Sequence, residues 1–336
     1  PKPDGGRRVQ SRSDPEISGI IPNWNGAAFL REVLACLGAG NSAARLEILV
    51  VDNGSSDGSA DLVRSLSPRA RVIENTVNAG FARAVNQGLH TAAGRYVAVI
   101  NNDTAWSDDW LDGCRRFLDA EPAYDFAAPL VLRYGERGIV DSAGDGVNLR
   151  LMPFKRGCGQ PADKPRRAGR QPITAASCSA VLFRREFFEQ YGAFDEDFFM
   201  YYEDVDLFFR AFLGGGRGCL LPEWTVFHHE GGSVGRYNAE ILKNSDYRSK
   251  HFMLVRNRVF FLVKNCPGSY FWLAGPLLAL ELARSLAYHL GRGRLILFLR
   301  AHREALRGLR TMWRKRRIVQ KNRVIPFRQV VAALRG

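Results

Sequence analysis

Three small polar residues, Asn101, Asn102 and Asp103, directly follow an apolar run at 95–100. The run has the length and β-rich composition of a buried strand in a parallel sheet. Open α/β sheets bind their ligands just beyond the carboxyl ends of such strands. One carboxylate and two amides at that position suit a divalent cation that is shared with a phosphate. The alternative is an ordinary turn, in which Asn and Asp are common.

Comparable polar clusters follow two earlier segments of strand-like composition. These strands are expected at 17–21 and 46–51, each followed by a helix, as in a parallel sheet covered on both faces. Because parallel strands present their carboxyl ends at one edge, the clusters should converge, which favours a ligand site over three unrelated turns. The clusters are Asn23/Asn25, Asp52/Asn53/Asp57 and Asn101/Asn102/Asp103.

Two common nucleotide-binding motifs are absent from the sequence. No G-x-G-x-x-G follows the first strand, which argues against a dinucleotide-binding Rossmann domain. No G-x-x-x-x-G-K-[ST] occurs either, which argues against a P-loop enzyme. The expected α/β sheet therefore binds its ligand by neither motif.

A second candidate site lies at the start of a helix that is expected to end near residue 213. Glu203, Asp204 and Asp206 follow the aromatic segment 198–202. Acids in a first turn can simply stabilise the helix dipole, but aromatic walls suit a sugar and raise the pKa of a carboxylate by desolvation. Asp206 is expected to pair with Arg210, four residues later. Asp204 is therefore the preferred candidate for a catalytic base, and Glu203 is the second.

Two adjacent histidines, His228 and His229, follow a strand expected at 217–227 and begin a glycine-rich segment. Imidazole nitrogen binds Mn²⁺ and related ions, so these residues are candidate metal ligands. The alternative is that both are ordinary surface or core histidines.

Charge is distributed unevenly along the 336 residues, whose formal net charge is +14. Residues 251–336 contain 18 Lys or Arg and only two acids, whereas the preceding part is nearly neutral. Basic and apolar residues are interleaved in expected helices at 251–264 and 292–317, and an apolar helix interrupted by Pro276, Glu281 and Arg284 is expected at 271–290. Basic amphipathic helices favour an anionic membrane surface. The alternatives are packing on the catalytic domain or a second subunit, and nucleic-acid binding, for which no recognition motif is found.

Targeting features are sparse. The polar residues 1–16 are expected to be a disordered lead-in without a signal peptide. No apolar run is long enough for a membrane-spanning helix. The six cysteines have neither metal-site spacing nor the pattern of a disulfide framework, which fits reduced thiols in the cytosol. We expect a cytoplasmic protein that associates peripherally with the inner face of the plasma membrane.

The chain resembles the family 2 inverting glycosyltransferases, which have the GT-A fold, over roughly residues 17–258. Each matching motif is weak alone, but their number and common order make the resemblance specific. The motifs are Ile-Pro-Asn-Trp-Asn-Gly at 21–26, Val-Asp-Asn-Gly-Ser-Ser-Asp-Gly-Ser at 51–59, Asn-Ala-Gly-Phe-Ala-Arg-Ala-Val-Asn-Gln-Gly at 78–88, Asn-Asn-Asp at 101–103, Glu-Asp-Val-Asp-Leu at 203–207 and His-His-Glu-Gly-Gly-Ser at 228–233.

The resemblance implies a role for each matching residue. Asp204 matches the catalytic base, with Glu203 beside it, and Asp103 matches the last residue of the metal-binding D-x-D motif. His228 matches a histidine that contacts the metal or diphosphate, and His229 could replace it if the register slips by one. The implied cofactor is Mg²⁺ or Mn²⁺. Nucleotide-sugar binding is implied for Pro22, Asn23, Trp24, Asp52, Asn53, Gly80, Asn86, Asn101 and Asn102.

One departure from the family pattern is informative. Asn101 replaces the first Asp of D-x-D, which lowers the charge of the metal site and is typical of the rhamnosyltransferase branch. That branch implies a dTDP-L-rhamnose donor and a lipid-linked saccharide acceptor used for a bacterial cell-surface glycan. The alternatives are a UDP-hexose or UDP-N-acetylhexosamine donor, a catalytically silent nucleotide- or glycan-binding module, and an adaptor that acts through the basic tail.

The predicted architecture is an α/β GT-A fold with a mostly parallel central sheet, flanking helices and C-terminal basic amphipathic helices. Its catalytic domain is expected at 17–250, with a nucleotide-binding part at 17–104 and an acceptor-binding and catalytic part at 105–250. A basic helical tail that associates with membranes is expected at 251–336, and a homo-oligomer is compatible with it.

Overall fold

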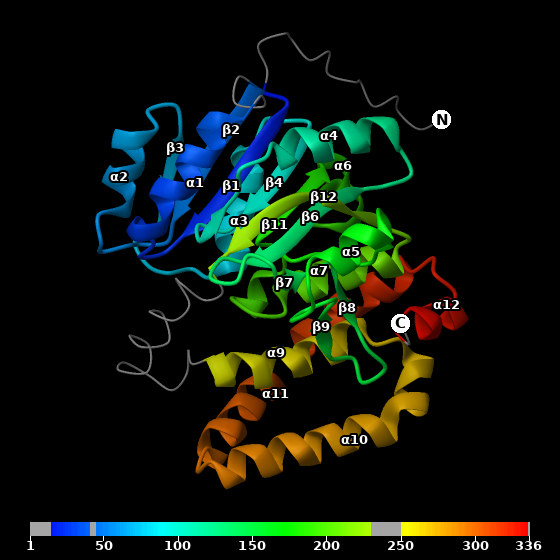
Figure 1. Ribbon diagram of the computed structural model, residues 1–336. Helices are drawn as coiled ribbons and strands as arrows, with labels where there is room; N and C mark the ends of the chain where they lie inside the picture. Colours follow the sequence, from blue (N-terminus) through cyan, green and yellow to red (C-terminus); the bar gives the residue numbers. More distant parts are fainter. Residues whose placement is uncertain (1–14, 41–44, 230–249, 335–336) are drawn as a thin grey trace, which may run out of the picture.

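The N-terminal part of the chain forms a parallel sheet in which strands and helices alternate (Figure 1). The computed structural model describes residues 15–40, 45–229 and 250–334. Strand β1 pairs with β2 on one side and β4 on the other, and β2 pairs with β3, all parallel. The strands are β1 (Ile17–Asn23), β2 (Leu46–Asp52), β3 (Arg71–Glu74) and β4 (Tyr96–Ile100), and the helices are α1 (Ala27–Ala39), α2 (Ser59–Leu66) and α3 (Phe81–Thr91).

The second part of the chain extends the same sheet through antiparallel as well as parallel pairs. The strand order is β10-β12-β6-β11-β4-β1-β2-β3, and β5 and β7 pair with β12 and β6. Strand β11 is antiparallel to both β4 and β6, so it joins the two halves. These strands are β5 (Thr104–Ala105), β6 (Phe126–Arg133), β7 (Val140–Ser142), β10 (Gln171–Ile173), β11 (Ala180–Arg184) and β12 (Gly218–His228).

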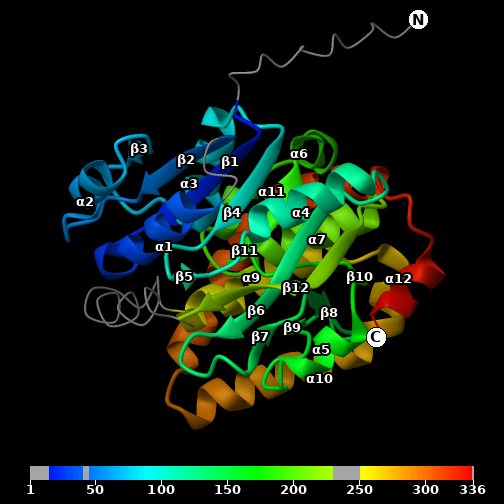
Figure 2. The ribbon, with the colours of Figure 1, turned by 45° about the horizontal axis from the view of Figure 1, so that its top comes forward.

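Helices cover both faces of the sheet, as the alternation of elements predicted (Figure 2). One face packs against α1, α2 and α4 (Trp110–Ala120), with Leu30, Val63 and Trp110 in its core. The other face packs against α3, α6 (Arg185–Tyr191) and α7 (Glu203–Leu213), with Val85 and Phe208 in its core. Burial of apolar residues on both faces explains why the central strands read as continuous apolar runs.

A third layer, formed largely by the C-terminal helices, lies beneath α7 (Figure 1). Apolar side chains of α7, α9, α11 and α12 share one core there, which includes Phe209, Phe261, Met312 and Val330. The elements of this layer are a hairpin of β8 (Asp145–Val147) and β9 (Pro153–Lys155), the 3₁₀ turn η2 (Glu196–Phe198), α9 (Lys250–Asn265), α10 (Gly268–Gly291), α11 (Leu295–Lys321) and α12 (Phe327–Ala333). A short helix, α5 (Asp163–Ala168), lies outside this layer and contacts β12.

A buried ionic network fixes α9 to the catalytic part of the chain. The ammonium group of Lys264 lies 2.6 Å from Asp195 Oδ2 and 2.8 Å from Asp206 Oδ2. Arg210 pairs with Asp206 at 2.8 Å, as its spacing predicted, and Asn265 Nδ2 donates to Asp206 at 2.7 Å. Burial would raise the pKa of Asp206, but Lys264 and Arg210 outweigh it and lower that pKa. Asp206 therefore serves as an anchor for α9.

The C-terminal helices occur where the sequence predicted them, with α12 in addition. Within the described residues, no helix combines the length and apolar composition that crossing a membrane requires. The division into domains at residue 250 stays a prediction, although α9 packs against α7 and η2.

Candidate active site

Polar residues at the ends of β1, β2 and β4 converge through one hydrogen-bonded chain. Asn102 Nδ2 donates to Asn23 Oδ1 at 2.7 Å, and Asn23 Nδ2 donates to Asp52 Oδ1 at 2.7 Å. Asp52 also accepts hydrogen bonds from the hydroxyl and backbone N–H of Ser55. The parallel register places Asn23 directly opposite Asp52. The three clusters therefore meet at one edge of the sheet, as expected.

A cavity of about 200 Å³, which we call the polar cavity, opens beside this chain of hydrogen bonds. Its walls come from the ends of β1, β2 and β4, from the segment before β11, and from the start of α7. The predicted residues that line it are Pro22, Asn23, Trp24, Asn53, Asn101, Asn102, Glu203 and Asp204. Asp52 is buried behind Asn23, with 3% of its surface exposed.

Two predicted nucleotide-binding residues, Gly80 and Asn86, do not line the polar cavity. They contact the segment 194–199 instead. Asn86 exchanges two hydrogen bonds with the backbone of Phe194, at 2.9 and 3.1 Å. Gly80 has a φ of +88°, and a Cβ at this position would lie 2.5 Å from the carbonyl oxygen of Phe199. Both residues therefore hold the segment 194–199 against α3. Their assignment to nucleotide binding stays a prediction.

The side chains of Asp103 and His228 face each other at the end of the sheet. His228 Nε2 lies 3.3 Å from Asp103 Oδ1, and His228 Nδ1 lies 2.9 Å from Asp141 Oδ2. Burial alone would lower the pKa of His228, but the two carboxylates raise it to about 9. Burial would raise the pKa of Asp103, but His228 outweighs it and lowers that pKa. Asp141, which the sequence analysis missed, thus orients His228 towards Asp103.

This pair fits a divalent cation. Asp103 Oδ1 is buried and faces His228 Nε2 at 3.3 Å without a close hydrogen bond, so a cation that replaces the Nε2 proton could lie between the two side chains. A carboxylate that holds the far nitrogen of an imidazole is a common support for a metal-binding histidine. Within the described parts of the chain, no group of three His, Cys, Asp or Glu side chains could hold a metal. Asp103 and His228 would therefore supply two ligands, and substrate or water the others.

His229 faces a different direction from His228. Its ring stacks on Tyr134 with the ring centroids 3.6 Å apart, and its Nε2 lies 3.5 Å from Glu32 Oε2. Successive residues of a strand point to opposite sides, so only one of the two histidines can face Asp103. The structure brings His228 to Asp103 and places His229 beside Tyr134 and Glu32.

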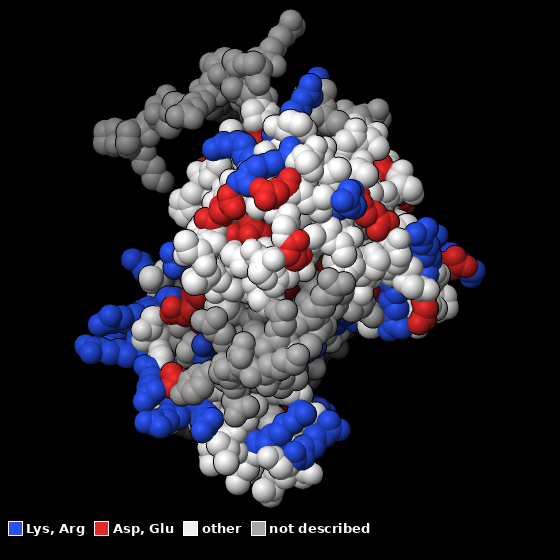
Figure 3. Space-filling view, turned by 90° about the vertical axis from the view of Figure 1, so that its left-hand side faces the viewer, with Lys and Arg blue, Asp and Glu red and all other residues white. Residues whose placement is uncertain are grey.

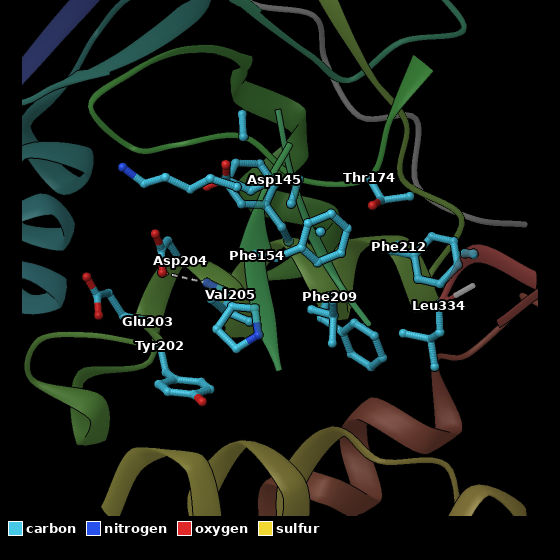
Figure 4. A pocket seen from close by; sticks show the side chains of 18 of the residues that line it. Asp145, Phe154, Thr174, Tyr202, Glu203, Asp204, Val205, Phe209, Phe212 and Leu334 are labelled. Atoms are coloured by element: carbon cyan, nitrogen blue, oxygen red, sulfur yellow. Dashed lines mark hydrogen bonds between the residues drawn. The ribbon is translucent and has the colours of Figure 1, made fainter. Parts of the chain in front are cut away.

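Three carboxylates, Asp145, Glu203 and Asp204, lie together at the start of α7 and in the β8–β9 hairpin (Figure 4). Burial raises the pKa of Asp204. Burial and the neighbouring acids Asp204 and Asp206 raise the pKa of Glu203 well above its usual value. Burial also raises the pKa of Asp145 to about 7. Burial and the neighbouring acids therefore disfavour the ionised form of Glu203 more strongly than burial disfavours that of Asp204, which leaves Asp204 as the better base of the two.

Backbone strain is concentrated directly before these acids. Phe199, Tyr201 and Tyr202 have φ values of 65°, 67° and 71°, which are unusual for residues with a side chain. Such strain persists only where the surroundings hold it in place. The side-chain amide nitrogen of Asn257 on α9 lies 2.7–2.9 Å from the carbonyl oxygens of Phe198, Met200 and Tyr201. We call residues 199–202 the strained loop.

Comparison with known proteins identifies the class of this molecule. The model of the glycosyl transferase family 2 matches residues 18–192, and the chain belongs to this family. The match ends before the strained loop, so Glu203, Asp204 and His228 lie outside it.

A relative with a similar sequence indicates the branch of the family. A Mycobacterium tuberculosis (strain H37Rv) N-acetylglucosaminyl-diphospho-decaprenol L-rhamnosyltransferase is 31% identical over 214 residues, covering 57% of this chain and 69% of that protein. The family and this relative make the chain a rhamnosyltransferase-like family 2 glycosyltransferase.

Two solved structures share the fold. The mannosyltransferase PcManGT from Pyrobaculum calidifontis, in complex with GDP-Man and Mn²⁺, has a TM-score of 0.53 and 20% identity, covering 92% of this chain and 86% of that one. S. aureus TarS 1–349 has a TM-score of 0.52 and 16% identity, covering 87% and 92%. At these identities the likeness concerns the fold alone, which is the predicted GT-A fold.

Proposed function

We propose that this glycosyltransferase transfers L-rhamnose from dTDP-L-rhamnose to a lipid-linked saccharide during synthesis of a bacterial cell-surface glycan. One observation carries the proposal: Asp204 lines two cavities, the polar cavity and a larger, mainly apolar one. A base shared by two cavities can meet a donor on one side and an acceptor on the other. The mycobacterial relative, whose name describes a lipid-linked N-acetylglucosamine acceptor, supports the choice of sugar and acceptor.

The proposed reaction is a single displacement that inverts the anomeric centre. Asp204 removes the proton from an acceptor hydroxyl while that oxygen forms a bond to the anomeric carbon. The bond from this carbon to the diphosphate breaks on the opposite face, and the nucleoside diphosphate leaves with the electron pair. The raised pKa of Asp204 suits this role, because a stronger base accepts the proton more readily. The charged form of Glu203, beside Asp204, is disfavoured by burial and by the neighbouring acids.

Donor binding is assigned to the polar cavity. The Asn102–Asn23–Asp52 chain holds the edge of the sheet rigid, and Trp24 offers a ring for the nucleoside. Asp103 and His228 would hold Mg²⁺ or Mn²⁺, which would stabilise the negative charge of the leaving diphosphate. The Mn²⁺ present in the PcManGT complex supports this assignment.

The pyrimidine of the nucleotide-sugar donor could be thymine or uracil. Both bases carry the same N3 proton, and Asp52, which lies behind Asn23, does not line the polar cavity, so a UDP-hexose or UDP-N-acetylhexosamine is the second candidate donor. A catalytically silent binding module would keep the polar cavity but transfer no sugar.

Attachment to an anionic membrane, on the cytoplasmic side, is proposed for the C-terminal helices. Lys and Arg gather over the lower part of the molecule, where these helices lie (Figure 3). Large apolar side chains are exposed on the same helices, among them Leu280, Leu290, Ile296, Leu306 and Trp313, each more than half exposed. Cationic and apolar side chains together suit a surface helix on anionic lipid. The proposed membrane-associating unit is 251–336, and the catalytic unit is 17–250.

The proposal is tested by binding first and by transfer second. Thermal unfolding is measured with dTDP, UDP and GDP, with and without Mn²⁺, because a ligand of the folded state raises the melting temperature. A Mn²⁺-dependent shift with dTDP that Asp103→Ala abolishes is expected. Transfer from dTDP-rhamnose to methyl N-acetylglucosaminide then tests the reaction, and NMR of the product tests inversion. Binding without transfer from any donor would favour the silent module.

A further inference from the structure

A cavity of about 340 Å³, which we call the apolar cavity, lies on the far side of Asp204 from the edge of the sheet. Its walls come from the β8–β9 hairpin, the segment 174–176, the strained loop, α7, α9 and α12. The two cavities share Tyr201, Glu203 and Asp204, so the same carboxylates border both. The sequence analysis predicted the carboxylates Glu203 and Asp204 and the aromatic segment before them, but not the apolar residues of α7, α9 and α12 in this wall.

The two ends of the apolar cavity differ in chemistry (Figure 4). Glu203 and Asp204 lie at one end, together with Asp145 and Lys155. The opposite end is formed by Phe209, Phe212 and Leu334, and among the residues that the structure describes no charged side chain lines it. The other apolar residues of the wall are Val147, Pro153, Phe154, Val205, Phe208, Leu254 and Ala333.

We propose that the apolar cavity binds an amphipathic acceptor, with its reactive sugar hydroxyl at Asp204 and an apolar chain between Phe209, Phe212 and Leu334. This inference rests on the proposed glycosyl transfer and specifies its acceptor. A purely saccharide acceptor would leave hydroxyl groups without hydrogen-bond partners against these side chains, which is unfavourable. An apolar chain would instead remove its own surface and that of the aromatic rings from water.

The apolar wall is held in place by contacts outside the cavity. The backbone N–H groups of Val324 and Ile325 donate to the carbonyl of Leu213, at 2.9 and 3.2 Å. Val330 on α12 is fully buried in the core beneath α7. The segment that carries Leu334 is therefore fixed to the end of α7. The apolar cavity is consequently formed before any ligand binds.

The apolar cavity is also linked to the helix that is proposed to lie on the membrane. The turn of the β8–β9 hairpin contacts α10 through an ion pair between Arg150 and Glu281 at 3.0 Å. Tyr270 Oη donates to the carbonyl of Leu149 in the same turn at 2.5 Å. An acceptor whose apolar part extends into a lipid layer could therefore reach Asp204 along this side of the molecule.

The experiment compares octyl and methyl β-D-N-acetylglucosaminide, each below its micelle concentration. Affinity for the full chain is measured by calorimetry, and transfer from dTDP-rhamnose is measured in parallel. We expect the octyl compound to bind at least about tenfold more tightly, since burial of even two methylene groups has an effect of this size. Phe212→Ser and Leu334→Ser should each reduce that difference to about threefold or less. Leu66→Ser, at an exposed position on α2, is the matched control and should keep the full difference.

Each outcome separates the two proposals. Equal affinity for both compounds, or an equal loss in Leu66→Ser, would overturn the inference, while transfer to the methyl compound would still support the proposed function. Selective octyl binding without transfer from any nucleotide sugar would overturn the proposed function instead. The comparison in the wild type needs no variant, so misfolding of a variant cannot hide the result.

Discussion

The side-chain amide of Asn257 donates to the carbonyl oxygen of Tyr201 at 2.7 Å, three residues before Asp204. Asn257 is fully buried on α9, and its nitrogen also lies within hydrogen-bond distance of the carbonyls of Phe198 and Met200. A helix more than 50 residues later in the chain thus holds the backbone that carries the proposed base. Local hydrogen bonds add to this support, since the backbone N–H groups of Phe199 and Met200 donate to the carbonyls of Glu196 and Phe198.

Asn257→Leu should therefore impair catalysis more than substrate binding. Without the amide, the three carbonyls lose their donor and the strained loop relaxes, which moves Asp204. We expect kcat to fall about 10- to 100-fold, because small displacements of a catalytic group have effects of this size, with little change in nucleotide affinity. Steady-state kinetics and nucleotide titration measure the two effects. Asn322→Ala, at an exposed position after α11, is the matched control. Equal kcat in the variant and the wild type would contradict a positioning role.

Asp204→Asn should lower the rate of transfer by about 10²- to 10⁴-fold, the usual contribution of a general base. Glu203→Gln should be milder, because burial and the neighbouring acids already disfavour the charged form of Glu203. In the wild type, kcat/KM should rise with pH through the raised pKa of Asp204, whose neighbours are Glu203, Asp145 and Lys155. The pH profile of initial rates checks this. A profile that is unchanged in Asp204→Asn would show that another group is the base.

Gly26→Ala should weaken nucleotide binding. A Cβ at this position would lie 2.1 Å from Asn102 Nδ2 and 2.4 Å from Asn23 Oδ1, so it would separate the two amides. We expect the affinity for dTDP or UDP to fall about tenfold or more, measured by calorimetry. Gly38→Ala is the control, because a Cβ on this residue of α1 meets nothing within 4 Å and alanine favours the helix. If Gly26→Ala and Gly38→Ala bound the nucleotide with equal affinity, the Asn102–Asn23 contact would not be needed for donor binding.

Asp145→Asn should stabilise the protein at pH 8 and have little effect at pH 4.5. The folded protein keeps a proton on Asp145 up to about pH 7, whereas the unfolded chain loses it near pH 4. Stability is therefore lost as pH rises between these values and stays lower above them. The shift corresponds to an upper limit of roughly 4 kcal/mol, and the partial exposure of Asp145 reduces it. Urea unfolding at both pH values measures the effect. The same gain at both pH values would contradict this origin.

Leu280→Ser combined with Leu290→Ser should reduce binding to vesicles that contain anionic lipid. Both side chains are more than half exposed on α10, so their removal should change the membrane contact and leave the fold intact. We expect the bound fraction to fall several-fold in flotation assays, with wild-type binding weakened by salt. Leu66→Ser, an exposed leucine on α2, is the control. If the wild-type protein did not bind the vesicles at low salt, attachment through these helices would be ruled out.

Local sequence patterns predicted much of the fold, but they did not predict the residues that hold the site residues in position. The apolar runs and the Asn or Asp residues after them predicted the strands and their convergence, because both signals lie within a few residues. Asp141, Asp145 and Asn257 were missed, since each acts on a residue that is distant in sequence. Adjacent histidines could be predicted to face opposite sides of a strand, but only the packed structure shows that His228 faces Asp103.

The contact between Asn257 and the strained loop has a consequence for synthesis of the chain. The strands of the sheet and the base itself leave the ribosome well before α9 does. A nascent chain that has not yet exposed α9 can form the sheet, yet it lacks the amide that fixes the backbone before Asp204. Catalytic competence should consequently arise late in translation, when the C-terminal helices emerge and the growing protein first presents a surface for lipid.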